Sequence, residues 1–189
     1  MDAFSYLSVL LSIILGLGIT QVLQGYRALL LSRSRVRLYA PTIIWSGLLL
    51  TFSAQLWWAS FGLANHHEWN FGTFAIILLQ TVLLYMMSAL VLPDIPADRD
   101  LDLKEHYFRE ASPFFIIGLM MIAVSISKDC LLDGKLPSTA NLAFHGLFAA
   151  MATTALLTRR SRIHELLAVL MVLFIITYIA LLFERLGQG

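Results

Sequence analysis

The sequence predicts an all-α, polytopic membrane protein, a bundle of six transmembrane helices, and three observations lead to this prediction. Of the 189 residues, 59% are hydrophobic and only 13% are charged, whereas a soluble domain has roughly 45–50% and about 25%. The mean hydropathy is +0.79, and a soluble globule of this length has too little interior to bury so much apolar surface. Six separate stretches are long and apolar enough to cross a hydrocarbon core of about 30 Å.

The six expected spans follow one another with short connections, at about 4–31, 38–63, 71–92, 112–131, 138–158 and 163–185. Each span should be helical, because backbone groups in a bilayer core must find hydrogen bonds within the protein. Pro41 and Pro113 stand at the expected first turns of the second and fourth spans, where proline is tolerated. The polar segment 93–112 is expected to be a solvated linker or a short interfacial helix. The whole chain then forms a single transmembrane domain.

The distribution of positive charge predicts the orientation of the spans. Ten of the 13 Lys and Arg residues lie in or beside the connections that follow spans one, three and five. Cytoplasmic loops carry such an excess of Lys and Arg, so both termini are expected outside. No basic segment precedes the first span, which indicates an uncleaved anchor rather than a signal peptide. With a net charge of +1 and no basic stripe, the sequence predicts no nucleic-acid partner.

Small and polar residues recur along one face of the first span, at helical spacings of three and four: Ser5, Ser8, Ser12, Gly16, Thr20, Gln24 and Arg27. Gln21 lies beside this face. Contacts between membrane helices favour small and polar residues, so the face is expected to be buried inside the bundle. Two uses remain open for it. Gln21 and Gln24 either form hydrogen bonds across closely packed helices, or they line a polar path.

The fifth span repeats this pattern with Ser138, Asn141, His145, Ala149 and Thr153. His145 is the one ionisable side chain expected well inside a span, and such groups often mark functional sites because their burial in a membrane is costly. Its ring either ties helices together through hydrogen bonds or lines a path. Gln55 of the second span and Gln80 of the third add amides that also need partners.

A cluster of charged residues is expected at the outer boundary of the membrane. Lys128 and Asp129 end the fourth span, and Glu184 lies near the end of the sixth. If these spans are neighbours, Lys128 can pair with Glu184; otherwise the side chains simply extend to the interface. The single cysteine, Cys130, excludes a disulfide framework and a cysteine-based metal site. No second histidine or carboxylate stands one helical turn from His145, so no metal and no cofactor is expected.

The sequence contains none of the catalytic patterns that would indicate an enzyme. It lacks a Gly-rich phosphate loop, a Gly-x-Ser-x-Gly turn, a His-Glu-x-x-His helix and a carboxylate in the middle of a span. The favoured function is therefore a non-catalytic membrane module, a scaffold or accessory subunit. Its partners would be the lipid bilayer and either further copies of itself or a larger membrane complex. The alternative is a small channel or facilitator with a polar path lined by spans one, two and five.

Four segments carry a resemblance to a known group of proteins: FSYLSVL with LGLGITQ in residues 4–21, RVRLY in 35–39, QLWW in 55–58 and NLAFH in 141–145. With these segments the chain resembles a family of uncharacterised proteobacterial six-span inner-membrane proteins. The resemblance covers nearly the whole chain. It implies a bacterial inner-membrane location and six spans, but it implies no activity and transfers no functional residue.

Overall fold

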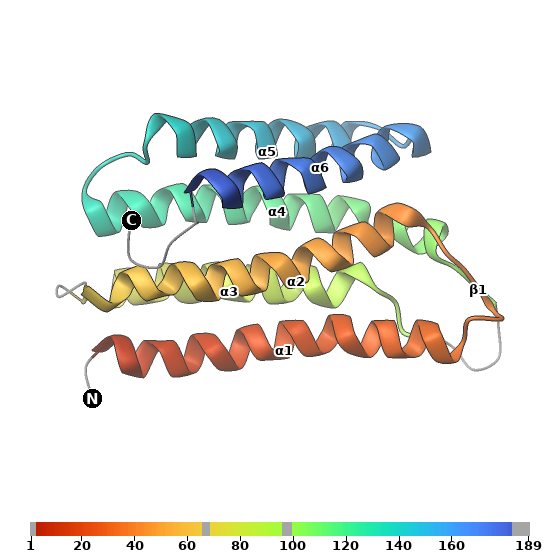
Figure 1. Ribbon diagram of the computed structural model, residues 1–189, viewed down its shortest axis with the longest axis horizontal. Helices are drawn as coiled ribbons and strands as arrows, with labels where there is room; N and C mark the ends of the chain where they lie inside the picture. Colours follow the sequence, from red (N-terminus) through yellow and green to blue (C-terminus); the bar gives the residue numbers. More distant parts are fainter. Residues whose placement is uncertain (1–2, 66–68, 96–99, 183–189) are drawn as a thin grey trace.

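The protein is a bundle of six long helices that all run nearly parallel to one axis (Figure 1). The structure, a computed structural model, describes residues 3–65, 69–95 and 100–182. The helices are α1 (Ala3–Leu31), α2 (Ala40–Ser60), α3 (Phe71–Val91), α4 (Leu103–Asp133), α5 (Thr139–Leu157) and α6 (Ser161–Leu182), and a 3-10 helix, η1 (Phe61–Asn65), follows α2. All six are long and apolar enough to cross a membrane, which confirms the predicted all-α, six-helix fold.

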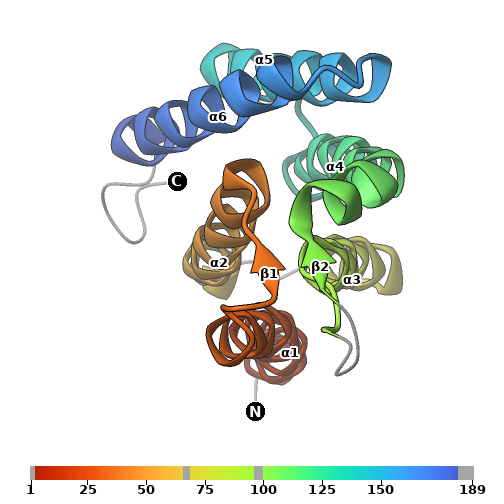
Figure 2. The same cartoon turned by 90° about the vertical axis from the view of Figure 1, so that its right-hand side faces the viewer.

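Helix α3 lies at the centre of the packing. It contacts α1, α2 and α4, while α5 packs on α4 and α6 packs on α2 and α5. As a result, α1 lies at one edge of the bundle and α5 and α6 lie at the opposite edge (Figure 2). Helix α1 begins and α6 ends at the same end of the bundle (Figure 1). We call this end the outer end, as the charge distribution predicts, and the opposite end the inner end.

Local side chains fix several of the helix ends. The Asn70 side chain accepts a hydrogen bond from the Thr73 amide over 2.9 Å, and Asp102 accepts one from the Lys104 amide over 2.8 Å. Both satisfy backbone donors that have no partner in the first turn of a helix. Helix α4 ends at Gly134, whose φ of 64° lies in the left-handed region that favours glycine. These caps set the bounds of α3 and α4.

Helix α4 begins at Leu103, earlier than the expected start near residue 112, so residues 103–112 form neither a linker nor a separate interfacial helix, and both alternatives were wrong for them. Two short strands, β1 (Val36–Arg37) and β2 (Leu101–Asp102), pair in parallel and anchor the helix start at the inner end. The first turns then bury Leu103, Tyr107 and Ala111 at a spacing of four. The other faces of this amphipathic segment are polar, so it does not stand out in the sequence as an apolar stretch.

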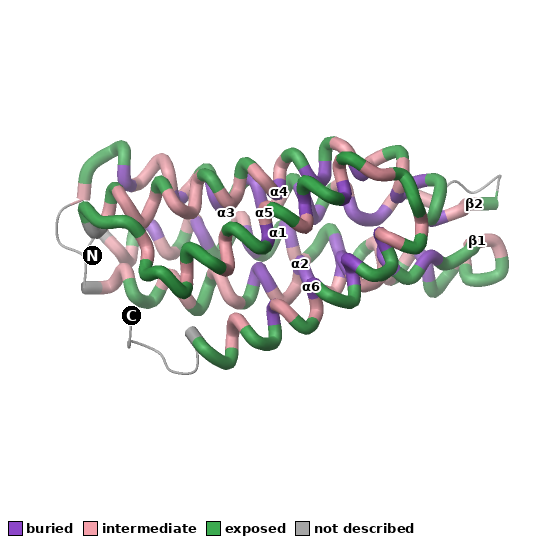
Figure 3. Tube along the Cα trace, turned by 90° about the horizontal axis from the view of Figure 1, so that it is seen from above, coloured by how far each residue is buried: buried purple, intermediate pink, exposed green. Residues whose placement is uncertain are grey.

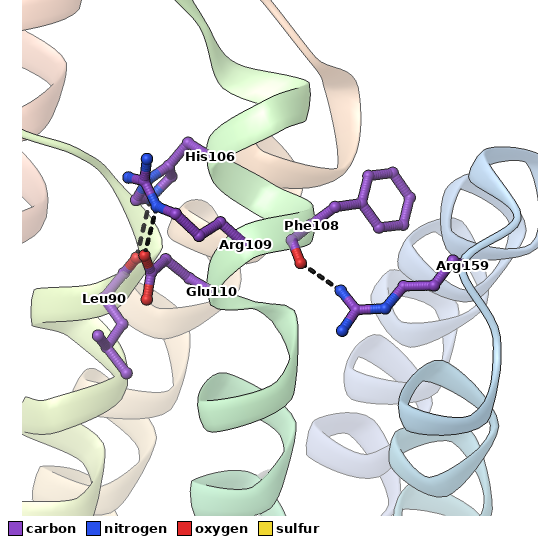
Figure 4. A network of polar contacts seen from close by, with 6 residues as sticks. All are labelled: Leu90, His106, Phe108, Arg109, Glu110 and Arg159. Atoms are coloured by element: carbon purple, nitrogen blue, oxygen red, sulfur yellow. Dashed lines mark hydrogen bonds and ion pairs between the residues drawn. The ribbon is translucent and has the colours of Figure 1, made fainter.

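Pro113 therefore lies inside α4 rather than in its first turn. A proline within a helix removes a backbone donor and disturbs the turn before it. Here the Arg159 guanidinium, which follows α5, donates to the Phe108 carbonyl (Figure 4). It also donates to the Ser112 hydroxyl over 3.0 Å. A charged group from another part of the chain thus supports the helix just before the proline.

The buried face of α1 is not the one that the sequence predicts. Leu7, Leu11 and Leu15 are buried against the bundle, whereas Ser12 and Gly16 are exposed. The alternation of buried and exposed positions along the helices is visible in Figure 3. The prediction failed because small residues in a membrane helix do not always lie on its buried face. Leucines spaced by four form an equally good packing ridge in a membrane bundle, because apolar contact with lipid and with protein is nearly equivalent there.

Candidate functional site

A cavity of about 150 Å³ lies among α2, α3, α4, α5 and α6. It extends from the level of Lys128, near the outer end, to Gln80 and Phe148 in the middle of α3 and α5. Its polar lining residues are Gln55, Gln80, Ser125, Lys128, His145 and Tyr178, and its aromatic walls come from Phe52, Phe144, Phe148 and Phe174. An apolar cavity that gathers a few polar side chains is the usual form of a small-molecule site.

His145 is held on both sides of its ring. Nδ1 lies 2.8 Å from the Asn141 carbonyl oxygen, and because a carbonyl only accepts, Nδ1 is the donor. Nε2 lies 3.1 Å from the Ser125 hydroxyl, which donates to it when the ring is neutral. The second contact joins α5 to α4. The ring therefore acts as a tie between helices at the cavity wall.

Tyr178 of α6 continues this polar wall. Its hydroxyl donates to Oδ1 of Asn141 over 3.4 Å, and the Gln55 amide lies within hydrogen-bonding reach of the same hydroxyl. The Tyr178 ring packs edge-on against Phe144, with centroids 5.1 Å apart. Through these contacts α2, α5 and α6 meet at one tyrosine.

Gln80 differs from the other polar lining residues because its amide oxygen has no hydrogen bond. The residue is only 8% exposed, and Oε1 is buried without a partner among the described residues. A buried acceptor without a partner costs about 1–3 kcal/mol. Among the described lining residues, Gln80 therefore carries a buried side-chain oxygen that still needs a hydrogen-bond donor.

Lys128 brings a positive charge to the outer part of the cavity. Its ammonium lies 3.6 Å from the Asp129 carboxylate, and both side chains are about one-fifth exposed. The predicted pairing of Lys128 with Glu184 falls on a residue outside those that the structure describes. The ammonium has three donors, so the contact with Asp129 leaves it able to bind a second group.

Aromatic rings line the inner side of the cavity. Phe52 and Phe148 meet across it with centroids 6.3 Å apart. Further toward the inner end, Trp45 packs edge-on against Phe114 and Phe115, each at 5.4 Å. These rings form a hydrophobic layer between the cavity and the inner end. The described part of the chain thus contains a pocket that ends inside the bundle.

The structure brings together some of the predicted site residues and separates others. Gln55, Gln80, His145 and Lys128 line the cavity, and Asn141 and Asp129 contact residues of its wall. Gln21 and Gln24 lie instead on the exposed face of α1. Helices α1 and α5 lie at opposite edges of the bundle (Figure 2), and no described residue of α1 lines this cavity together with His145.

Sequence reasoning missed a buried polar cluster at the inner end, centred on His164. This ring is fully buried; its Nε2 donates to the Thr158 carbonyl over 3.0 Å, and its Nδ1 accepts from the Tyr107 hydroxyl over 2.9 Å. Tyr39 packs edge-on against Tyr107, and burial raises the pKa of Tyr39 above its usual value. The one available signal was the apolar spacing around His164, since Leu167, Ala168 and Met171 are also buried.

A second histidine of the inner end, His106, caps the end of α3. Its Nε2 donates to the Leu90 carbonyl over 3.1 Å, in the last turn of that helix, where carbonyls lack helical partners. Its Nδ1 lies 3.2 Å from the Arg109 guanidinium, which can only donate (Figure 4). The two partners therefore require a neutral imidazole with the proton on Nε2. Both inner histidines serve packing between helices.

Comparisons with protein-family models, with curated proteins and with solved structures found no match for this chain. The resemblance to a proteobacterial inner-membrane family and the bacterial location therefore remain predictions from the sequence. The fold presents two features that bear on function, namely the cavity and the exposed polar face of α1.

Proposed function

We propose that the protein is a non-catalytic, multi-pass module of a bacterial inner membrane that assembles with a second copy of itself through α1. The observation that carries this proposal is the exposed polar face of α1, formed by Ser12, Gly16, Thr20 and Gln24. These residues recur every fourth position on a helix that is otherwise long and apolar enough to cross the membrane.

The position of the two glutamines on α1 makes exposure to lipid unfavourable. At a rise of about 1.5 Å per residue, Gln21 and Gln24 lie only about 6 and 10 Å from the middle of this 29-residue helix. Neither side chain has a hydrogen bond to another described residue. Hydrogen bonds between membrane helices contribute about 0.6–2 kcal/mol each, so a partner helix would stabilise both amides.

A second copy of α1 fits this face. An amide is both donor and acceptor, so Gln24 can pair with Gln24 of the partner subunit across a twofold axis. Gly16 has no heavy atom of the rest of the bundle within 4 Å of the position of an added Cβ. Small residues four positions apart allow two helices to approach closely. Val9, Ile13 and Leu17 are exposed beside them and supply apolar contact.

The channel alternative has less support. The aromatic rings of Phe52 and Phe148 line the inner part of the polar cavity, and the glutamines of α1 do not line it. A facilitator would need a polar path through the inner half of the bundle, where Trp45, Phe114 and Phe115 are buried. These features favour a non-catalytic membrane module over a channel or facilitator.

Disulfide crosslinking in membranes tests the proposal. In a background in which Cys130 is replaced by Ala, Gly16→Cys should give a covalent dimer on mild oxidation. Leu11→Cys, which lies on the buried face of α1, should give none. Leu173→Cys serves as the exposed control on α6, and it should crosslink far less than Gly16→Cys. A monomer at Gly16→Cys, or equal crosslinking at Leu173→Cys, would exclude assembly through α1.

A further inference from the structure

We infer that the cavity binds a neutral aromatic ring that carries a hydroxyl group, such as a phenol or the head group of a hydroquinone. This site is independent of the proposed assembly through α1, because no residue of α1 lines the cavity. The inference rests on the size of the cavity, on its aromatic walls, and on the two polar groups that lack sufficient partners, Gln80 and Lys128.

The size and walls of the cavity suit a single ring. Its volume is about 150 Å³, comparable with an engineered apolar cavity that binds benzene. Phe52 packs edge-on against Phe148 with centroids 6.3 Å apart, and Phe174 lies 6.4 Å from Phe148, so contacting rings supply an aromatic wall for a bound ring. Aromatic rings favour edge-on and offset contacts with another ring at such distances. A long acyl chain would not fit in this volume, so a chain attached to a bound ring would extend out of the cavity.

The buried oxygen of Gln80 sets the hydrogen-bonding requirement. Oε1 has no partner among the described residues and the residue is 8% exposed, so a bound molecule that presents a donor would satisfy it. A hydroxyl group on the ring supplies this donor. A carboxylate does not, because it is only an acceptor when ionised. Gln80 therefore favours an alcohol or a phenol over an organic acid.

The positive charge of Lys128 disfavours a cationic ligand. Aromatic cavities bind ammonium groups in many proteins, but here the Lys128 ammonium is itself part of the lining. A second cation would meet a like charge at short range. A neutral ring avoids this repulsion, and its hydroxyl group can donate a hydrogen bond to Gln80 at the inner part of the cavity. A neutral hydroxyl-bearing ring is the class that suits both side chains.

The primary experiment compares two probes of nearly the same shape, 4-methylphenol and toluene. Binding to the full chain in phosphatidylcholine nanodiscs is measured by ligand-observed NMR, with empty nanodiscs as the reference for partition into lipid. One additional hydrogen bond in a dry site is worth about a factor of ten in affinity. We expect 4-methylphenol to bind about tenfold more tightly than toluene. Equal affinities would mean that water alone satisfies Gln80, and would overturn the inference.

Two variants test whether Gln80 is the group responsible for the preference for 4-methylphenol over toluene. Gln80→Met keeps the size of the side chain but removes the acceptor, so it should abolish the preference for 4-methylphenol and leave toluene binding unchanged. Gln21→Met is the matched control, since the same change on the exposed face of α1 should preserve the preference. The comparison of probes on the unmodified protein remains decisive if Gln80→Met fails to fold. A preference that persists in folded Gln80→Met would contradict the site.

Competition experiments test the chemical class of the ligand and whether the ligand comes from the membrane or from the water phase. Tetramethylammonium and decanoate should not displace 4-methylphenol, and displacement by either at equal concentration would overturn the assignment. Decyl hydroquinone should displace it. If the decyl chain improves affinity beyond its partition into empty nanodiscs, the natural ligand comes from the membrane; if the two compounds bind alike after that correction, it comes from the water phase. Failure of decyl hydroquinone to compete at any concentration would contradict the hydroquinone assignment.

Discussion

The hydroxyl of Tyr107 donates a hydrogen bond to Nδ1 of His164 over 2.9 Å, deep in the inner half of the bundle. The other ring nitrogen of His164 donates to the Thr158 carbonyl over 3.0 Å. This pair joins α4 to α6 and to the connection that precedes α6. Tyr107 lies in the polar segment that precedes the expected fourth span, and its contact with His164 helps to hold the first turns of α4 against the bundle.

Replacing Tyr107 by Phe should destabilise the bundle. The change removes the only hydrogen-bond donor to Nδ1 of His164 among the described residues and leaves a buried acceptor without a partner. The expected loss is about 1–3 kcal/mol in the free energy of unfolding. Unfolding in mixed micelles with increasing SDS, followed by circular dichroism, measures it.

Tyr85→Phe provides the control for this substitution. Tyr85 lies on α3, is only half-buried, and has no hydrogen bond through its hydroxyl in the described part of the chain. Its replacement should change the free energy of unfolding by less than about 0.5 kcal/mol. Equal effects of the two substitutions would show that the hydrogen bond to His164 adds no stability.

Two glycines of α1 should respond differently to substitution by alanine. A Cβ atom on Gly25 would lie 2.6 Å from Cδ1 of Leu92 and 2.8 Å from its Cβ, so the contact between α1 and the end of α3 must shift. Overpacking of this kind costs about 1–3 kcal/mol. At Gly16 an added Cβ meets nothing within 4 Å. Gly25→Ala should therefore lower monomer stability in an SDS titration, while Gly16→Ala should not.

The number and type of the long helices could be predicted from the sequence, whereas the inward face of α1 could not. Six apolar stretches of sufficient length leave no other fold, because a bilayer tolerates no unpaired backbone. Which face turns inward depends on relative packing. Leu11 and Gly16 are both compatible with a helix contact and with lipid, and only the three-dimensional fit against α3 decides between them.

The candidate site could be predicted in part for a similar reason. Gln55, Gln80 and His145 stand out as polar side chains in apolar spans, and they do line one cavity. The hydrogen bond of His145 to Ser125, by contrast, depends on the packing of α4 against α5. The burial of His164 could not be predicted, because Arg159, Arg160 and Arg162 precede it in the sequence and charged neighbours indicate a solvent-exposed segment. In space, its ring is fully buried and packs against Tyr107, Phe108 and Phe115.

Cysteine labelling should establish the orientation that the charge distribution predicts. With Cys130 replaced by Ala, a membrane-impermeant maleimide added from the periplasm should modify Leu136→Cys and spare Ser34→Cys. Both positions are exposed and lie at opposite ends of the bundle. Neither substitution changes the number of Lys and Arg residues on which the prediction rests.

Labelling after cell disruption is the control for this experiment, since both cysteines should then react. The reverse pattern in intact spheroplasts, with Ser34→Cys modified and Leu136→Cys protected, would place the Arg-rich connections outside. The excess of Lys and Arg in those connections would then have another cause than membrane topology.

Replacing Gln80 by Met should stabilise the protein in the absence of ligand, opposite to the usual effect of a core substitution. The change removes a buried oxygen without a partner and keeps nearly the same volume against Leu84 and Phe52, which line the same cavity. Relief of an unpaired acceptor is worth about 1 kcal/mol or more. The free energy of unfolding in an SDS titration should rise by that amount. Gln21→Met, on the exposed face of α1, should leave the monomer unchanged. A loss of stability at Gln80→Met would mean that the amide is already satisfied, and a hydroxyl-bearing ligand would then have no unpaired oxygen to bind.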